Sequence, residues 1–218
     1  MQSLKALANL VRYKIAGEPY HHNLFRVGMV LTLDPTPFIL ARGATKVADL
    51  AAAGTTSVQA VSSVIADQVV LTRLYLDGDG SFLQIWVDGG GAVQECRLFT
   101  RHDQETPPDT DTWQVWLGET DGLIGWTQFQ TLDEKLYDRQ WSPGLARIEP
   151  VLFDETVTTA QGTLRRSLRS MLYAAGTGLA APAPATEYLL VSAVDDGDQA
   201  WVDIHAGIDL NPASLTLA

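Results

Sequence analysis

The chain has 218 residues, of which 46% are hydrophobic and 19% charged, and its formal net charge at pH 7 is −11. This composition excludes an intrinsically disordered protein and is typical of a soluble globular one. The acidic balance argues against a nucleic-acid-binding protein, because such proteins need basic surface to displace counterions from phosphates.

Strand signals dominate the chain. After an amphipathic segment that predicts a helix at residues 3–15, β-rich runs bounded by turn residues predict strands at 27–33, 37–42, 68–76, 81–88, 92–99, 113–118, 123–130, 149–159, 187–194 and 200–210. Only DGDG and GGG separate the three runs between residues 68 and 99, which therefore predict an antiparallel meander. The runs on either side of ETDG, at 113–118 and 123–130, predict a further hairpin.

A second helix is predicted at residues 163–173. Its apolar residues recur at positions i, i+4, i+7 and i+8, on one face of a helix: Leu164, Leu168, Met171 and Leu172. The Ala/Pro-rich stretch at 177–187 is typical of an ordered loop or short linker. We therefore expect a mainly β protein with minor helix, in which hairpins connect antiparallel strands. We expect a single unit over residues 1–218, with a loop boundary at 177–187 before a C-terminal strand pair.

The sequence DGDG at residues 77–80 raises the question of a calcium loop. An EF-hand loop needs oxygen ligands at its first, third and fifth positions and a bidentate Glu at its twelfth. With Asp77 at the third position, Tyr75 and Trp86 would occupy the first and the twelfth. A turn explains every residue, because Asp and Gly tolerate the positive φ of tight hairpins. We therefore predict a hairpin turn without a bound ion.

No motif for a metal or a cofactor is present. His21 and His22 are adjacent, so in an extended segment they point to opposite faces and are poor joint ligands. The chain lacks a P-loop, a dinucleotide-binding glycine motif and a Gly-x-Ser-x-Gly motif. Its single cysteine, Cys96, has no neighbouring base, excludes an intramolecular disulfide and suits a reducing compartment. We expect a cytoplasmic protein with neither metal nor cofactor.

Asp203 and His205 are the candidate catalytic residues. They share one face of the predicted strand at 200–210, and a carboxylate beside a histidine can orient a general base. The same pattern is also typical of an exposed, solvated strand face, which is the interpretation we favour.

Trp113 and Trp116 are candidate binding residues, because their odd spacing on a predicted strand places them on opposite sides and leaves one exposed. Filling of a β core by large side chains is the alternative. Arg165, Arg166 and Arg169 form the densest basic cluster of the chain, on the polar face of the predicted helix. Such a face binds acidic partners or anionic lipid, but in so acidic a chain we expect the arginines to pair internally.

The charge is unevenly spread along the chain. Residues 103–138 hold nine acids and one base, and residues 187–218 hold six acids and no base, whereas residues 1–50 hold six bases and three acids. Segregated charge steers partners of opposite sign. Together with the dense tryptophans and the lack of a complete catalytic set, it favours a non-enzymatic protein-binding or assembly module. The alternative is a hydrolase that uses Asp203 and His205.

Four segments carry a resemblance to a known family: GEPYHHNLFRVG, LIGWTQFQTLDEKLYDRQW, MLYAAGTG and EYLLVSAVDDGDQAWVDIHAGIDL. Their order is similar to that of the uncharacterised bacterial YjfK-like family, over most of the chain from about Gly17 onward. The resemblance implies no active-site residue. It implies an accessory role in the cytoplasm, at the membrane or beside a modifying enzyme. The resemblance also implies that the protein is encoded near phage-shock-like membrane-stress proteins and ATP-grasp peptide-ligase-like enzymes.

Overall fold

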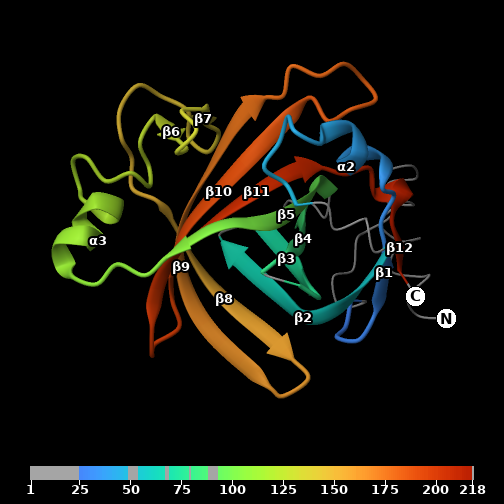
Figure 1. The fold of residues 1–218 in the computed structure, drawn as a ribbon. Coiled ribbons are helices and arrows are strands. Elements are labelled where there is room, and N and C mark those ends of the chain that lie inside the picture. The colour runs from blue at the N-terminus through green and yellow to red at the C-terminus, as the bar shows by residue number, and fades with distance from the viewer. Residues whose placement is uncertain (1–24, 49–53, 67–68, 79, 88–92, 218) are drawn as a thin grey trace.

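The computed structural model describes residues 25–48, 54–66, 69–78, 80–87 and 93–217, and it is mainly antiparallel β. Eight strands close into a barrel in the order β2-β3-β4-β5-β11-β10-β9-β8, with β8 pairing back onto β2 (Figure 1). Their bounds are β2 Thr55–Ala66, β3 Val69–Leu76, β4 Phe82–Val87, β5 Val93–Glu105, β8 Val151–Thr159, β9 Thr163–Gly176, β10 Thr186–Asp195 and β11 Ala200–Asp209. The predicted fold class and the meander β3-β4-β5 are therefore confirmed.

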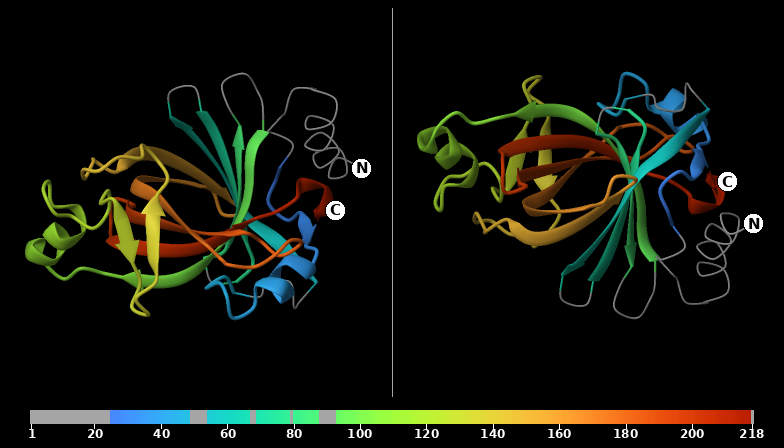
Figure 2. Two further views of the ribbon diagram at one scale, coloured as in Figure 1. Left: turned by 90° about the horizontal axis from the view of Figure 1, so that it is seen from above. Right: turned by 90° about the horizontal axis from the view of Figure 1, so that it is seen from below.

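Short elements cover the outside of the barrel. Strands β1 (Val30–Thr32) and β12 (Thr216–Leu217) extend the sheet from β2, whereas β6 (Gln128–Gln130) and β7 (Leu136–Arg139) extend it from β9. Two helices, α2 and α3, lie on opposite sides of the barrel (Figure 2). Helix α2 spans Thr36–Ala41, α3 spans Thr110–Leu117, and a 3₁₀ turn, η3, spans Pro212–Ser214.

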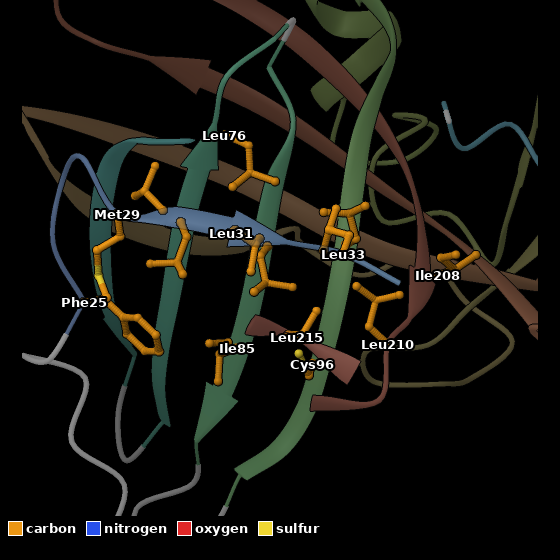
Figure 3. Packing of buried hydrophobic residues seen from close by; sticks show 14 of the residues in the cluster. Phe25, Met29, Leu31, Leu33, Leu76, Ile85, Cys96, Ile208, Leu210 and Leu215 are labelled. Carbon is orange, nitrogen blue, oxygen red and sulfur yellow. The ribbon is translucent and has the colours of Figure 1, made fainter. Parts of the chain in front are cut away.

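Strand alternation gives the barrel wall one apolar outer face between β3 and β5. Leu74, Ile85 and Leu98 are fully buried there. They pack against the segment that carries β1, α2 and η3, as Figure 3 shows for Leu31, Leu215 and their neighbours. Because successive side chains of a strand point to opposite faces, the intervening residues of these strands face the barrel interior. Cys96 is buried in this outer cluster, as expected of a structural residue.

The predicted helix at 163–173 is wrong, because these residues belong to β9. This strand pairs with β8 along its first half and with β10 along its second. Leu168 and Leu172 point into the barrel clusters while Met171 packs on the outer face under β7. Both faces are buried from Ser170 to Ala174, so apolar residues occupy both there, and the spacing of the leucines and Met171 happens to match one face of a helix.

Two predicted strands are also wrong. Residues 37–42 form most of α2, and residues 113–118 form α3 and its end, so no hairpin joins 113–118 to 123–130. Helix α3 begins after Asp109, whose side chain accepts a hydrogen bond from Thr112 N at 2.8 Å and so caps the first turn. Strand β2 was not predicted, because its small Ala and Ser residues carry little strand signal. The predicted helix at 3–15 lies outside the described residues.

The turn interpretation of DGDG is confirmed for the residues described there. Strands β3 and β4 pair in antiparallel register up to Tyr75 and Phe82, and Gly78 and Gly80 on the connection have positive φ. With Asp77 as the third position of an EF-hand loop, the twelfth position is Trp86, which cannot supply the bidentate carboxylate that calcium needs there.

We predict that titration of metal-free protein with calcium gives no binding isotherm. The measurement is isothermal titration calorimetry on the full chain, beside the Asp79→Ala variant. A micromolar isotherm that Asp79→Ala abolishes would show that this loop binds calcium.

Candidate functional site

A cavity of about 120 Å³ lies inside the barrel. Side chains from six strands line it, namely β3, β4, β5, β9, β10 and β11, and the backbone of Gly80 closes one side. Its apolar wall includes Phe82, Leu190 and Trp201, and its polar wall includes three arginines, one tyrosine, Asp203 and His205. Ligand sites commonly combine apolar walls with convergent polar groups, and this combination marks the cavity as a candidate site.

Glu155 on β8 is the centre of a buried polar network beside this cavity. Its carboxylate is fully buried and accepts hydrogen bonds from Ser62 Oγ at 2.5 Å, Tyr75 OH at 2.8 Å and Arg166 Nε at 2.6 Å. Arg73 Nη1 lies 3.6 Å away. Burial alone would raise the pKa of Glu155, but the charges of the two arginines and the hydrogen bonds hold it below its ordinary value. The carboxylate is therefore ionised at neutral pH.

Asp203 on β11 faces the cavity, and its carboxylate contacts side chains of β5 and of β11 itself. It accepts hydrogen bonds from Gln104 Nε2 at 2.9 Å and from Trp201 Nε1 at 2.7 Å, and Arg101 Nε lies 3.4 Å from it. Only 6% of the residue is exposed. The favoured expectation of a solvated strand face is therefore wrong for Asp203, because barrel closure turns this face inward.

His205 lies on the same inward face and is 7% exposed. Its Nε2 is 3.1 Å from the carbonyl oxygen of Gly80, which can only accept, so Nε2 carries the proton. Within the described residues Nδ1 has no hydrogen-bond partner, so neither ring nitrogen contacts Asp203. Burial and the charges of Arg73, Arg101 and Arg166 lower the pKa of His205 to about 3. The imidazole is neutral at pH 7, with the lone pair of Nδ1 unprotonated.

A second candidate site is a groove of about 950 Å³ outside the barrel. Helix α3 and the loop after it form one wall, and the outer faces of β8, β9 and β10 form the other. Its apolar lining includes Trp113, which is half-buried, and Leu152, which is 59% exposed.

The rim of this groove is acidic. Glu119, Asp121, Glu149 and Asp195 line it together with a single basic residue, Arg169. All four carboxylates belong to exposed residues. Arg147 pairs with Glu149 at 3.2 Å, so four carboxylates face two guanidiniums, and the surface remains net negative and attracts basic groups.

The structure separates the other residues that the sequence grouped. Both tryptophans lie on α3, but Trp116 is buried and stacks on Phe129, whereas Trp113 lines the groove. On strand β9 the three arginines alternate: Arg165 and Arg169 are exposed, and Arg166 points inward to Glu155. They do not form one basic face, because the segment is a strand and not a helix.

Sequence reasoning missed Arg73, Tyr75 and Glu155, which surround the cavity. One signal could have found one of them. Arg73 stands alone among apolar or β-branched residues in its strand run, and a charge in such a place is almost always paired when it is buried. The partners of such a residue were not predictable, because residues of β3 contact residues of β8 and β9 that are 80 or more positions away in the sequence.

Two general features bear on function. Among the described residues, no helix is both long and apolar enough to cross a membrane. In the same part of the chain, no three His, Cys, Asp or Glu side chains are grouped to hold a metal ion.

Comparison with known proteins gives one result. The family described as "Protein of unknown function (DUF2491)" matches residues 12–216. Neither the curated proteins nor the solved structures contain a match to this chain. The family match spans nearly the whole sequence, including every strand of the barrel. The chain therefore belongs to the DUF2491 family.

Proposed function

We propose that this protein is a non-enzymatic binding module of the cytoplasm whose outer groove takes up a basic segment of another protein. The observation that carries the proposal is the groove beside α3, in which an accessible tryptophan and leucine lie within a rim of four carboxylates. Interfaces commonly combine a large aromatic anchor with a charged rim that guides the partner. The complementary ligand is a segment with Lys or Arg on both sides of an apolar side chain.

The resemblance to the YjfK-like family supports a more specific role. It suggests that the partner belongs to a membrane-stress system or to a peptide-ligase-like enzyme, and that the protein acts as an accessory to it. The acidic groove fits basic segments, which such membrane-proximal proteins use to approach anionic lipid. Nucleic acid is not a fitting partner for a surface of this sign.

The binding role is tested by selecting displayed random peptides on the immobilised full chain. We expect the selected peptides to be rich in Lys and Arg around one aromatic or aliphatic residue, and to lose affinity as salt is raised. Trp113→Ala should weaken them at least about tenfold, because a buried aromatic anchor contributes 2 kcal/mol or more. Trp126→Ala is the matched control, since Trp126 is 44% exposed but lies outside the groove. Peptides that bind both variants equally well would place recognition elsewhere.

A hydrolase that uses Asp203 and His205 is the second candidate function. Its support is that both residues line one cavity and that Nδ1 of His205 is unprotonated at neutral pH. Catalysis by a paired carboxylate and imidazole would require a contact between them that the ring does not make. Hydrolysis of small aryl esters by the wild type, lost in His205→Gln, would favour the hydrolase over the binding module.

A further inference from the structure

The groove beside α3 has a charge opposite to that of the N-terminal segment of the chain. Residues 1–17 contain Lys5, Arg12 and Lys14 and no acidic residue, so this segment carries a charge of +3. The four carboxylates and two guanidiniums at the groove leave it a charge of −2. The segment and the groove are therefore complementary in sign, and each attracts the other.

The apolar residues of this segment also match the groove. In the helix that the sequence predicts at residues 3–15, four of them recur at i, i+3, i+7 and i+11 and share one face: Leu4, Leu7, Val11 and Ile15. At about 100° per residue, Lys5 and Arg12 fall on one side of this face and Lys14 on the other. A helix commonly enters a hydrophobic groove through such an apolar face. The flanking bases would then meet the acidic rim.

Another stretch of the chain has the same charge but is not available. Residues 156–186 also hold three bases and no acid. All three bases lie on β9, which is fixed in the barrel wall by its pairing with β8 and β10. One of them, Arg166, binds Glu155 inside the barrel. Within this sequence, the N-terminal segment is therefore the ligand that fits the groove.

The connection to the barrel is too short for the segment to reach the groove of its own chain. Phe25, where the described chain begins, packs in the outer cluster beside β1 and α2 (Figure 3). Helices α2 and α3 lie on opposite sides of the barrel (Figure 2), and the groove is beside α3. Residues 16–24 span at most about 32 Å when fully extended. A compact chain of this length has a radius of gyration of about 17 Å and so a diameter of about 44 Å.

We propose that the groove of one copy binds residues 3–15 of a second copy, so that the protein assembles with itself head to tail. The apolar face of the segment packs on Trp113 and Leu152, and its bases face the carboxylates of the rim. Because the two contacting surfaces differ, each end of the assembly keeps one of them free, and the assembly grows until it closes into a ring or extends as a filament. This inference rests on the proposed function and names the chain itself as one partner of the groove.

Sedimentation of the full-length wild type over a range of protein concentrations tests the proposal. At low salt the mean mass should rise with protein concentration. At high salt it should fall toward the mass of the monomer, because salt screens the charges of the rim and of the segment. An excess of a synthetic peptide of residues 1–17 should dissociate the assembly, since the peptide occupies the groove.

Two variants each remove one half of the contact. Trp113→Ala removes the aromatic anchor of the groove, and the triple variant Lys5→Gln, Arg12→Gln, Lys14→Gln removes the bases of the segment. Each variant alone should associate with itself about tenfold more weakly or worse. Mixed in equal amounts, the two should form a dimer that cannot grow. In this dimer the triple variant supplies the intact groove and the Trp113→Ala copy supplies the intact segment.

Trp126→Ala and Arg165→Gln are the controls and should assemble as the wild type does, because both residues are exposed outside the groove. The proposal is overturned if the wild type stays monomeric at low salt and millimolar protein concentration, or if the peptide leaves its assembly unchanged. It is also overturned if either groove or segment variant, with an unchanged melting temperature, assembles like the wild type. A mixture that stays monomeric overturns it as well. Selected basic peptides that still bind the groove would then confine the failure to self-assembly and leave the proposed function intact.

Discussion

Glu155→Gln should lower the free energy of unfolding by about 3–5 kcal/mol, the usual cost of breaking a buried ion pair. The substitution keeps the shape of the side chain and removes its charge. Arg73, whose side chain is 4% exposed, and Arg166, at 19%, would then have no carboxylate at the centre of their network. Urea denaturation at pH 7 measures the effect as a lower midpoint with an unchanged slope.

Asp154→Asn is the matched control for this prediction. Asp154 is the adjacent residue on β8, but its side chain is exposed, so its loss of charge should change stability by no more than about 0.5 kcal/mol.

Because the folded-state pKa of Glu155 is below its ordinary value of 4.5, the stabilisation that Glu155 provides is fully present above pH 4.5 and is lost as the pH falls through the lower folded value. Equal urea midpoints for the two variants would mean that the arginines do not depend on Glu155.

Acidification from pH 7.5 to pH 5 should cost the protein about 2 kcal/mol through His205 alone. The pKa of this histidine is about 3 in the folded chain against 6.5 for the free side chain. Between these values the unfolded chain binds the extra proton and the folded chain does not. The contribution of His205 is therefore complete above pH 6.5 and is progressively lost as the pH falls toward 3.

Urea denaturation at a series of pH values between 7.5 and 5 measures this dependence. This range lies above the ordinary pKa values of carboxylates, so His205 dominates the difference between wild type and His205→Gln. The variant should lose the additional slope, whereas His102→Gln should keep it. The prediction fails if the wild type and His205→Gln show the same pH dependence over this range.

The fold class could be predicted because much of its signal is local. Strands β3, β4 and β5 are separated by Gly- and Asp-rich connections, and their alternation survives because the outer face is apolar while the inner face mixes aromatic residues with charged ones. The β10–β11 pair is predictable for the same reason, since DDGDQ supplies its turn. In these segments the sequence pattern and the final structure agree because the pairing partners are neighbours in the chain.

The errors have two physical origins, which are burial of a strand on both faces and a helix cap beside residues that favour strands. The second half of strand β9 is covered on both faces, so its apolar residues lose their period of two there and imitate a helix. Helix α3 has aromatic residues that favour strands, yet it begins at the Asp109 cap and buries only Trp116. Weak local preferences of this kind are overridden by packing.

The candidate sites were only partly accessible to sequence reasoning. Asp203, His205 and Trp113 were singled out by residue type and spacing, and each lines one of the two sites. Their surroundings were not predictable. Glu155 and Arg166 lie opposite each other on the paired strands β8 and β9, but Arg73 reaches Glu155 only through the closure of the barrel.

The sequence by itself determined the β class, the connections of the β3–β4–β5 meander and of the β10–β11 hairpin, and the acidic charge. These depend on residue type and on contacts between neighbours in the chain. Only the tertiary structure decided which strand face is inside and which charges are paired. The pairing of β8 with β2 closes the sheet and turns a row of polar side chains inward, away from water. An unpaired charge is too unstable at that depth, and partners such as Glu155 for Arg73 and Asp203 for Arg101 come from strands far away in the sequence.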